Sequence, residues 1–220
     1  MADFESDWPG RGRVLYQIVH RLITFIVAAH ILRISVEDEH LIPESGPVIL
    51  MSNHQSNLDP LLLGWAARRP LNMPAKIELF RIPILKQFIE GLGSYPVDRD
   101  ARDSASLRRS LSVLRQGRVL AVFPEGTRSR TGEVGPFTTM LTRLAMREGA
   151  PIVPVSMTGT GAILPPGKRL PALRSKIVIR FGSPVDLSGW AGRRPTDHDL
   201  KRSTEEIRRR VIELSHHAIP

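Results

Sequence analysis

The sequence predicts an α/β fold in which a mostly parallel central sheet is flanked by helices. Short apolar runs rich in Val, Ile and Leu recur along the chain, and segments with helical periodicity lie between them. Such alternation is typical of parallel sheets, because a strand returns to the same direction only through a crossover, usually a helix. The length of 220 residues suits a single domain with a sizeable core.

The predicted strands share short runs dominated by apolar, often β-branched, side chains. They span residues 32–36, 48–51, 71–75, 94–97, 119–123, 152–156 and 177–181. The predicted helices carry apolar residues every three or four positions. They span residues 60–67, 83–91, 104–116, 137–148 and 203–215.

Local signals mark the ends of these helices. Gly117 and Gly149 stand where C-terminal caps are expected, and Asp103 or Ser104 is positioned to cap the third helix. The stretch 188–199 is rich in Gly, Arg, Pro and Asp. We therefore expect this stretch to be the most mobile connector of the chain.

The first 33 residues are expected to form a membrane-associated unit ahead of a domain over residues 34–220. One amphipathic helix is predicted over 13–33, and its apolar centre over 22–32 is too short to span a bilayer comfortably. An interfacial helix flanked by arginines suits it better. A signal peptide, despite the lack of a convincing cleavage site, and a helix docked on the sheet stay open as alternatives. The predicted polar stripe of this helix is formed by Arg13, Gln17, His20, Arg21 and Thr24.

A strong excess of basic residues indicates an anionic partner. The formal net charge is +9 and the isoelectric point is about 10.9. Nucleic acid is a poor fit, because aromatic residues are few and neither zinc-ligand spacing nor an RNA-binding aromatic motif is present. We expect an anionic membrane surface instead, to which each nearby basic residue adds about 1 kcal/mol. The chain contains no cysteine, which is consistent with the cytosol, so the cytoplasmic face of the cell membrane is the expected location.

The segment Asn53–Pro60 places a histidine and an aspartate directly after the apolar run 47–51. The imidazole of His54 is a side chain of the type that can take a proton from an alcohol and return it. Asp59 can accept a hydrogen bond from the second ring nitrogen and thereby fix the tautomer. The alternatives are an ordinary loop histidine, and an aspartate that caps a helix with Pro60 at its first position.

Two further polar segments follow predicted strands, and they carry arginines suited to an anion. Arg128 offers a planar fork that matches phosphate, and Gly126 lets the backbone approach a ligand closely. Glu125 can pair with an arginine or bind a substrate hydroxyl. Arg99 follows the strand predicted over 94–97. The carboxyl ends of strands are where an open α/β sheet places its active site, although exposed arginines are also expected in an arginine-rich protein.

Four blocks, in this order, resemble those of the glycerolipid acyltransferases typified by 1-acylglycerol-3-phosphate (lysophosphatidic acid) acyltransferase. The resemblance runs from about residue 47 to 168, and the first and third blocks at this separation are its most specific part. The segments 75–80 and 164–167 are similar to other recurring parts of that family. The four blocks are His54 to Asp59 (H-x-x-x-x-D), Tyr95 to Arg99, Phe123 to Ser129, and Ile152 to Val155.

The resemblance implies transfer of a fatty acyl group from an acyl thioester to the free hydroxyl of lysophosphatidic acid, which yields phosphatidic acid. It implies that His54 is the general base and that Asp59 orients it. No metal or redox cofactor is implied, and the thioester of coenzyme A or acyl carrier protein is a cosubstrate. The residues expected to hold the glycerol phosphate are Arg99, Glu125, Gly126, Thr127 and Arg128, with Lys76 adding positive charge.

Two features bear on the mechanism and on the acceptor. The chain has neither a G-x-S-x-G segment nor a cysteine, so we expect direct transfer without an acyl-enzyme. Where the family usually shows G-x-F-K-x-G, this chain has Thr138 in place of lysine and Met140 in place of glycine. One prediction is weaker selectivity for a phosphate monoester headgroup; the alternative, slightly favoured because Arg99 and Arg128 already supply charge, is that both residues lie on a helix face away from the site. The alternatives are an acyltransferase for another lyso-lipid and a non-catalytic membrane lipid-binding protein.

Overall fold

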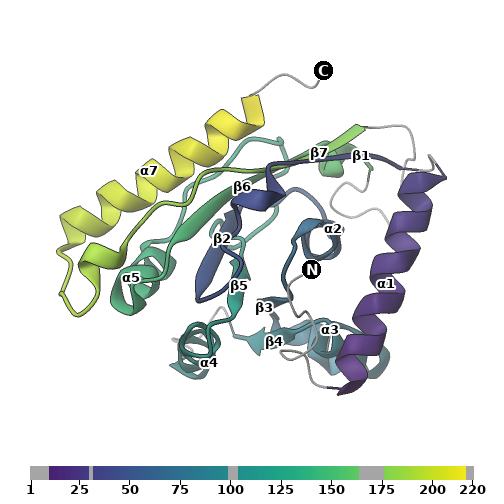
Figure 1. Ribbon diagram of the computed structural model, residues 1–220, viewed down its shortest axis with the longest axis horizontal. Helices are drawn as coiled ribbons and strands as arrows, with labels where there is room; N and C mark the ends of the chain where they lie inside the picture. Colours follow the sequence, from purple (N-terminus) through teal and green to yellow (C-terminus); the bar gives the residue numbers. More distant parts are fainter. Residues whose placement is uncertain (1–9, 30–31, 99–103, 164–175, 217–220) are drawn as a thin grey trace.

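The computed structural model describes residues 10–29, 32–98, 104–163 and 176–216, which form one α/β unit around a seven-stranded sheet (Figure 1). The strands are β1 (Arg33–Glu37), β2 (Val48–Ser52), β3 (Leu71–Lys76), β4 (Ser94–Val97), β5 (Val119–Val122), β6 (Ile152–Thr158) and β7 (Lys176–Phe181). Their order in the sheet is β1-β7-β6-β2-β5-β3-β4. All neighbours are parallel except β6 and β7, so the predicted mostly parallel sheet is confirmed.

Helices cover both faces of the sheet (Figure 1). The described helices are α1 (Gly10–Ala28), α2 (Asp59–Ala66), α3 (Pro83–Gly91), α4 (Ser104–Arg115), α5 (Thr139–Glu148), α6 (Thr160–Ile163) and α7 (Asp197–His216). Short 3-10 turns are η1 (Glu39–Leu41), η2 (Ile77–Arg81) and η3 (Ser188–Trp190). One apolar core lies between the sheet and α2, and a second lies between the opposite face and α4, α5 and α7.

Strand β2 explains why the central strands read as unbroken apolar runs. Val48 and Leu50 pack into the core beside α2, whereas Ile49 and Met51 pack into the core on the other face. All four side chains are fully buried. A parallel strand covered by helices on both sides needs apolar residues at every position, not only at alternate ones.

The C-terminal region departs from the sequence prediction. Helix α7 begins at Asp197 instead of residue 203, and η3 occupies part of the stretch expected to be a mobile connector. The reason is a reciprocal cap. The backbone N–H of Asp199 donates to Thr196 Oγ1 at 3.2 Å, while the backbone N–H of Thr196 donates to Asp199 Oδ2 at 2.9 Å. The C-terminal cap predicted at Gly149 is confirmed, since its φ of 62° lies in the left-handed region.

Helix α1 ends at Ala28, before the predicted end at residue 33, and it contacts α2 and α3. The Tyr16 hydroxyl donates to the carbonyl of Gly64 at 3.1 Å, and burial raises the pKa of Tyr16 to about 12, so the hydroxyl stays protonated. Trp65 Nε1 donates to Thr24 Oγ1 at 3.0 Å. Tyr16 and Thr24 of α1 thus bond to residues of α2, while Val14, Ile18, Leu22 and Phe25 are 56–66% exposed.

Neither α1 nor any other helix among the residues described is both long enough and apolar enough to cross a membrane. The helix cap predicted at Asp103 or Ser104 lies at the edge of this described region, since Asp103 is outside it and α4 begins at Ser104.

Candidate active site

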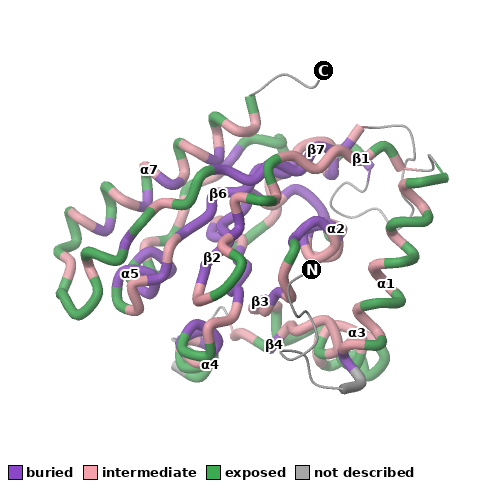
Figure 2. The backbone as a smooth tube through the Cα atoms, in the orientation of Figure 1, coloured by how far each residue is buried: buried purple, intermediate pink, exposed green. Residues whose placement is uncertain are grey.

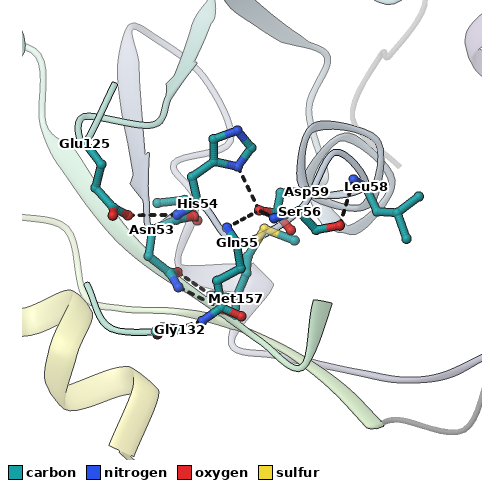
Figure 3. A network of polar contacts seen from close by, with 10 residues as sticks. Asn53, His54, Gln55, Ser56, Leu58, Asp59, Glu125, Gly132 and Met157 are labelled. Atoms are coloured by element: carbon teal, nitrogen blue, oxygen red, sulfur yellow. Dashed lines mark hydrogen bonds and ion pairs between the residues drawn. The ribbon is translucent and has the colours of Figure 1, made fainter. Parts of the chain in front are cut away.

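The carboxyl ends of β2 and β5 bring the two most specific sequence blocks together. These strands are parallel neighbours, so the loops that follow them leave the same edge of the sheet. The backbone N–H of His54 donates to Glu125 Oε1 at 2.8 Å (Figure 3). The backbone N–H of Ser129 donates to the carbonyl of His54 at 2.7 Å. Segments 70 residues apart in the chain therefore form one bonded unit around the histidine.

His54 and Asp59 form a close pair. The distance from His54 Nδ1 to Asp59 Oδ2 is 2.8 Å (Figure 3). The same carboxylate oxygen accepts the backbone N–H of Gln55 at 2.6 Å and that of Ser56 at 2.8 Å. Asp59 is fully buried, so these donors stabilise a carboxylate that water does not reach. With Asp59 at Nδ1, the other ring nitrogen is left to act on a substrate.

The helix-cap alternative for Asp59 is wrong. Helix α2 begins at Asp59 itself, the preceding Leu58 holds the cap position, and no side chain bonds to the first turn. Pro60 follows as expected at the start of the helix, and it has no N–H to be capped. The carboxylate instead turns back onto the loop before the helix, because the ring and two backbone N–H groups of that loop all point at it.

Phe123 holds the imidazole ring from its face. The two rings are stacked, with centroids 4.2 Å apart and planes inclined by 21°. Phe123 follows β5 directly, so the same strand end supplies both this contact and Glu125. The His54 side chain is only 13% exposed. Its ring is thus fixed by Asp59 at one edge and by Phe123 at one face, and within the described residues Nε2 makes no hydrogen bond.

A cavity of about 610 Å³ opens beside His54. Its polar lining includes Lys76, Thr127 and Arg128 as well as His54. Much of the remaining lining is apolar and comes from α1, α2, β3 and α3, for example Val19, Trp65, Leu85, Phe88, Ile89 and Leu92. The site therefore combines a candidate base, two cationic side chains and a hydrocarbon-like wall, which suits an amphiphilic ligand.

Arg128 has an unused donor in this region. Its Nη1 is buried and has no hydrogen-bond partner among the residues that the structure describes. A buried guanidinium donor left without an acceptor is unfavourable, so it marks a place where an anionic oxygen would be stabilised. Lys76 is 53% exposed and lies 3.6 Å from Glu78, a contact that is weak at a solvated surface.

Comparison with known proteins agrees with this geometry. A family model described as Acyltransferase matches residues 33–158, which is more than half of the chain. The chain belongs to the Acyltransferase family. The matched range holds six of the seven strands, the histidine and aspartate, and the loop that carries Arg128.

Relatives of this acyltransferase domain carry one recurring name. The 1-acyl-sn-glycerol-3-phosphate acyltransferase of Saccharomyces cerevisiae is 38% identical over 76% of this chain and 55% of its own length. The chloroplastic protein LPAT1 of Arabidopsis thaliana is 32% identical over 70% of this chain and 44% of its own length. The chain thus spans about half the length of these relatives. The crystal structure of the 1-acyl-sn-glycerophosphate acyltransferase PlsC from Thermotoga maritima matches with a TM-score of 0.75 and 28% identity, over 95% of this chain and 83% of that one.

Some of the residues predicted to bind the acceptor line the cavity, and others do not. Lys76, Thr127 and Arg128 line the cavity. Gly126 does not, but its φ of +72° belongs to the left-handed region that favours glycine, so it shapes the turn before Arg128. Arg99 lies outside the described residues.

Among the described residues, Glu125 bonds to backbone N–H groups and to no arginine, although arginine pairing was one of the two roles considered for it. Oε1 accepts the N–H of His54 at 2.8 Å, and Oε2 accepts the N–H of Gly135 at 3.1 Å. Burial raises the pKa of Glu125, and the two backbone bonds oppose that rise. The carboxylate ties the histidine loop to the segment that leads into α5.

Asn53 and Gln55 support the histidine loop, and the sequence analysis assigned them no role. The Asn53 amide nitrogen donates to the carbonyl of Met157 at 2.9 Å, and its amide oxygen accepts the N–H of Met157 at 2.7 Å (Figure 3). Gln55 Nε2 donates to the carbonyl of Gly132 at 2.9 Å. The available signal was an amide on each side of the histidine, directly after a strand buried on both faces.

Thr138 and Met140 mark the departure from the usual family pattern. Thr138 precedes α5, and its backbone N–H donates to the carbonyl of Pro124 at 3.1 Å. The side chains of both residues are exposed, and neither lines the cavity. Neither residue is therefore placed to contact a headgroup bound in the cavity, and the predicted change in headgroup selectivity has no support from a direct contact.

Proposed function

We propose that this protein transfers a fatty acyl group from an acyl thioester to the free hydroxyl of 1-acylglycerol-3-phosphate and so forms phosphatidic acid. The observation that carries the proposal is the His54–Asp59 pair at the polar end of a largely apolar cavity. The names of the relatives and of the similar crystal structure support the choice of acceptor.

The proposed reaction is a direct transfer. His54 Nε2 takes the hydroxyl proton of the acceptor while the hydroxyl oxygen bonds to the thioester carbonyl carbon. The carbon–sulfur bond then breaks, and the departing thiolate takes the proton from the imidazolium. Asp59 keeps Nδ1 protonated throughout and stabilises the transient positive charge. The products are an ester and a free thiol, and no group becomes attached to the enzyme.

The acceptor phosphate is proposed to bind Arg128, whose buried Nη1 donor needs an acceptor. Thr127 and Lys76 line the same cavity and add a hydroxyl and a second positive charge. Arg99 belongs to this set by its sequence block, and Gly126 shapes the turn that presents Arg128. Glu125 acts one step away from the acceptor, since its bonds hold the loop of the base.

The apolar part of the cavity is proposed to receive hydrocarbon chain. Its lining by Val19, Leu85, Phe88 and similar side chains offers no charged partner to a headgroup. An acyl chain placed there brings its ester or thioester carbonyl close to His54. The donor is a thioester of coenzyme A or acyl carrier protein, and no metal or redox cofactor takes part in the proposed scheme. We place the protein at the cytoplasmic face of the membrane, bound to an anionic lipid surface.

A lyso-lipid panel tests the proposal. Free thiol released from an acyl thioester is measured with lysophosphatidic acid, lysophosphatidylglycerol, lysophosphatidylcholine or no acceptor. We expect release that depends on the acceptor and is fastest with the phosphate monoester, together with phosphatidic acid as the lipid product. Faster release with a phosphodiester acceptor would assign the enzyme to another lyso-lipid. Tight lipid binding with no thiol release in the presence of any acceptor would make the protein a carrier.

A further inference from the structure

Exposed apolar side chains gather on one part of the molecule. Among the described residues, nine large hydrophobic side chains are strongly exposed. Four of them are on α1, four lie in the segment 77–84, and the ninth is Met140 at the start of α5. Ile84 is 85% exposed, the highest value of the nine, and Ile82 is 54% exposed. Isolated apolar residues are normal on a surface, but such a concentration marks an interaction site.

The α1 side chains form a stripe. Val14, Ile18 and Leu22 follow one another at intervals of four, and Phe25 comes three residues later, so all four share one side of the helix. Tyr16 of α1 points toward the protein, because it bonds to Gly64, whereas Thr24 is exposed and bonds to Trp65. Exposed residues recur along the length of α1 (Figure 2).

The segment 77–84 leads into α3, a helix that packs against α1. Helix α3, which begins directly after Ile82, contacts α1, and a side chain added at Gly91 of α3 would meet Leu15. Both elements also line the cavity, α1 through Val19 and its neighbours and the other through Leu79 and Leu85. The elements that expose apolar side chains to solvent therefore also supply apolar side chains to the cavity wall.

We propose that Ile82 and Ile84 form a second membrane anchor, which inserts into the lipid surface together with the exposed stripe of α1. This inference rests on the proposed function, because a lipid substrate has to pass from the bilayer to the cavity. Two anchors on elements that both line the cavity hold it close to the membrane, whereas a single helix would leave the domain free to rotate.

The charges beside this surface fit an anionic leaflet. Arg21 and Arg81 are exposed next to the apolar side chains, and the one acidic residue of the segment 77–84, Glu78, lies 3.6 Å from Lys76. The whole chain carries a net charge of +9. A second copy of this chain would bring like charges together at the same place, which is unfavourable. The observations therefore favour a lipid surface over self-association.

The first test compares matched variants of the full-length chain on vesicles of phosphatidylglycerol and phosphatidylcholine. The double variant Ile82→Ser with Ile84→Ser should partition at least about tenfold more weakly, since two isoleucines lose their burial in lipid. Met140→Ser removes a side chain of the same 54% exposure as Ile82, and it should partition like the wild type. Equal partitioning of all three proteins would overturn the second anchor.

The second test does not depend on weakening the protein. The natural chain has no cysteine, so Ile84→Cys and Met140→Cys each carry one polarity-sensitive fluorophore without a competing label. The probe at position 84 should shift to the emission of an apolar environment on vesicles, and the probe at position 140 should not. A probe at position 84 that stays in water on vesicle-bound protein would overturn the proposal. A shift without vesicles that grows with protein concentration would assign the surface to a second copy.

Turnover separates this inference from the proposed function. Neither Ile82 nor Ile84 lines the cavity, so the double variant should retain wild-type thiol release with a short-chain, monomeric lysophosphatidic acid. Wild-type protein that releases no thiol from the acyl thioester in the presence of that acceptor would sink the proposed function, whatever the vesicle result. Retained turnover with lost vesicle binding is the result expected if both proposals hold.

Discussion

The His54–Asp59 loop and the wall formed by α1 and α3 enclose the same cavity, yet they are built in opposite ways. The loop is buried and held by many bonds, since Asp59 accepts three hydrogen bonds and Asn53 exchanges two with Met157. The wall is held by few polar contacts and exposes much of its apolar surface, with Phe25 at 66% and Ile84 at 85% exposure.

This difference separates two requirements of lipid chemistry. A general base has to keep one orientation, because a small displacement of a reacting group costs much of the rate. A lipid substrate instead has to enter from an apolar surface, which is stable in water only if it is small or covered. Damage to the loop should therefore lower turnover with any acceptor, whereas damage to the wall should lower only the use of membrane lipids.

The largest effect is expected from Asp59→Asn. The amide keeps an acceptor oxygen but loses the charge that stabilises the imidazolium and selects its tautomer. We expect turnover at saturating substrates to fall about 100- to 10,000-fold, the range that general-base catalysis contributes. Steady-state thiol release measures it, and circular dichroism checks that the fold persists. Turnover within a few-fold of wild type would remove Asp59 from the mechanism.

The same residue should also be essential to the stability of the loop. Asp59→Ala leaves two buried backbone N–H groups without an acceptor, so the free energy of unfolding should fall by about 2–4 kcal/mol in urea denaturation. Asp197→Ala is the control, because Asp197 is 86% exposed in a surface ion pair and should change stability by less than about 0.5 kcal/mol. Equal effects of the two variants would contradict the rigid-loop description.

Arg128→Ala should act on the acceptor rather than on the donor. Loss of a charge-assisted hydrogen bond costs about 1.5–3 kcal/mol, so KM for lysophosphatidic acid should rise at least tenfold. KM for the acyl thioester should stay near the wild-type value. Arg130→Ala is the control two residues away, on an exposed side chain that does not line the cavity. A parallel rise in both KM values would mean that Arg128 only maintains the loop.

Substitutions in the wall should weaken membrane binding and leave turnover with a monomeric acceptor unchanged. Ile18→Ser with Phe25→Ser removes two members of the exposed stripe, which should weaken partitioning to anionic vesicles by about tenfold or more. Thiol release with a monomeric acceptor should persist, because neither residue lines the cavity. If that turnover fell as steeply as vesicle binding, α1 would have to be a structural part of the active site.

The smallest effect concerns the pH dependence of stability at Glu125. Burial raises its pKa above the ordinary value of 4.5, so the folded protein holds this proton to a higher pH than the unfolded chain. The stability contributed by the proton is complete below 4.5 and is lost as pH rises through the folded pKa. Glu125→Gln should flatten this part of the curve of unfolding free energy against pH. Parallel curves for the two proteins would show that Glu125 is not perturbed.

Much of the fold could be predicted from local patterns. The strand at 94–97 and the helix at 83–91 agree with the structure at both ends, and the other strands differ by two residues at most. Buried strands read clearly because both of their faces meet helices. The start of α7 was missed because a cap formed by Thr196 and Asp199 is hidden in a stretch whose composition resembles a loop.

The features that the sequence did not reveal depend on contacts between segments distant in the chain. Helical periodicity shows that α1 has two faces, but it does not show which face meets the protein. Tyr16 and Thr24 bond to residues of α2, and the apolar stripe faces outward. The bonds of Asn53 to Met157 and of Glu125 to Gly135 likewise join segments whose proximity appears only after folding. The residue pair at His54 and Asp59 was accessible because its five-residue spacing is local.

Chemical rescue of a histidine variant tests the central claim most directly. His54→Ala is assayed for acceptor-dependent thiol release at saturating substrates, with and without added imidazole, beside His40→Ala as an exposed control. We expect a loss of about 100- to 10,000-fold for His54→Ala, partial recovery with imidazole, and neither effect for His40→Ala. Near-normal turnover of His54→Ala without imidazole would contradict the assignment of His54 as the general base.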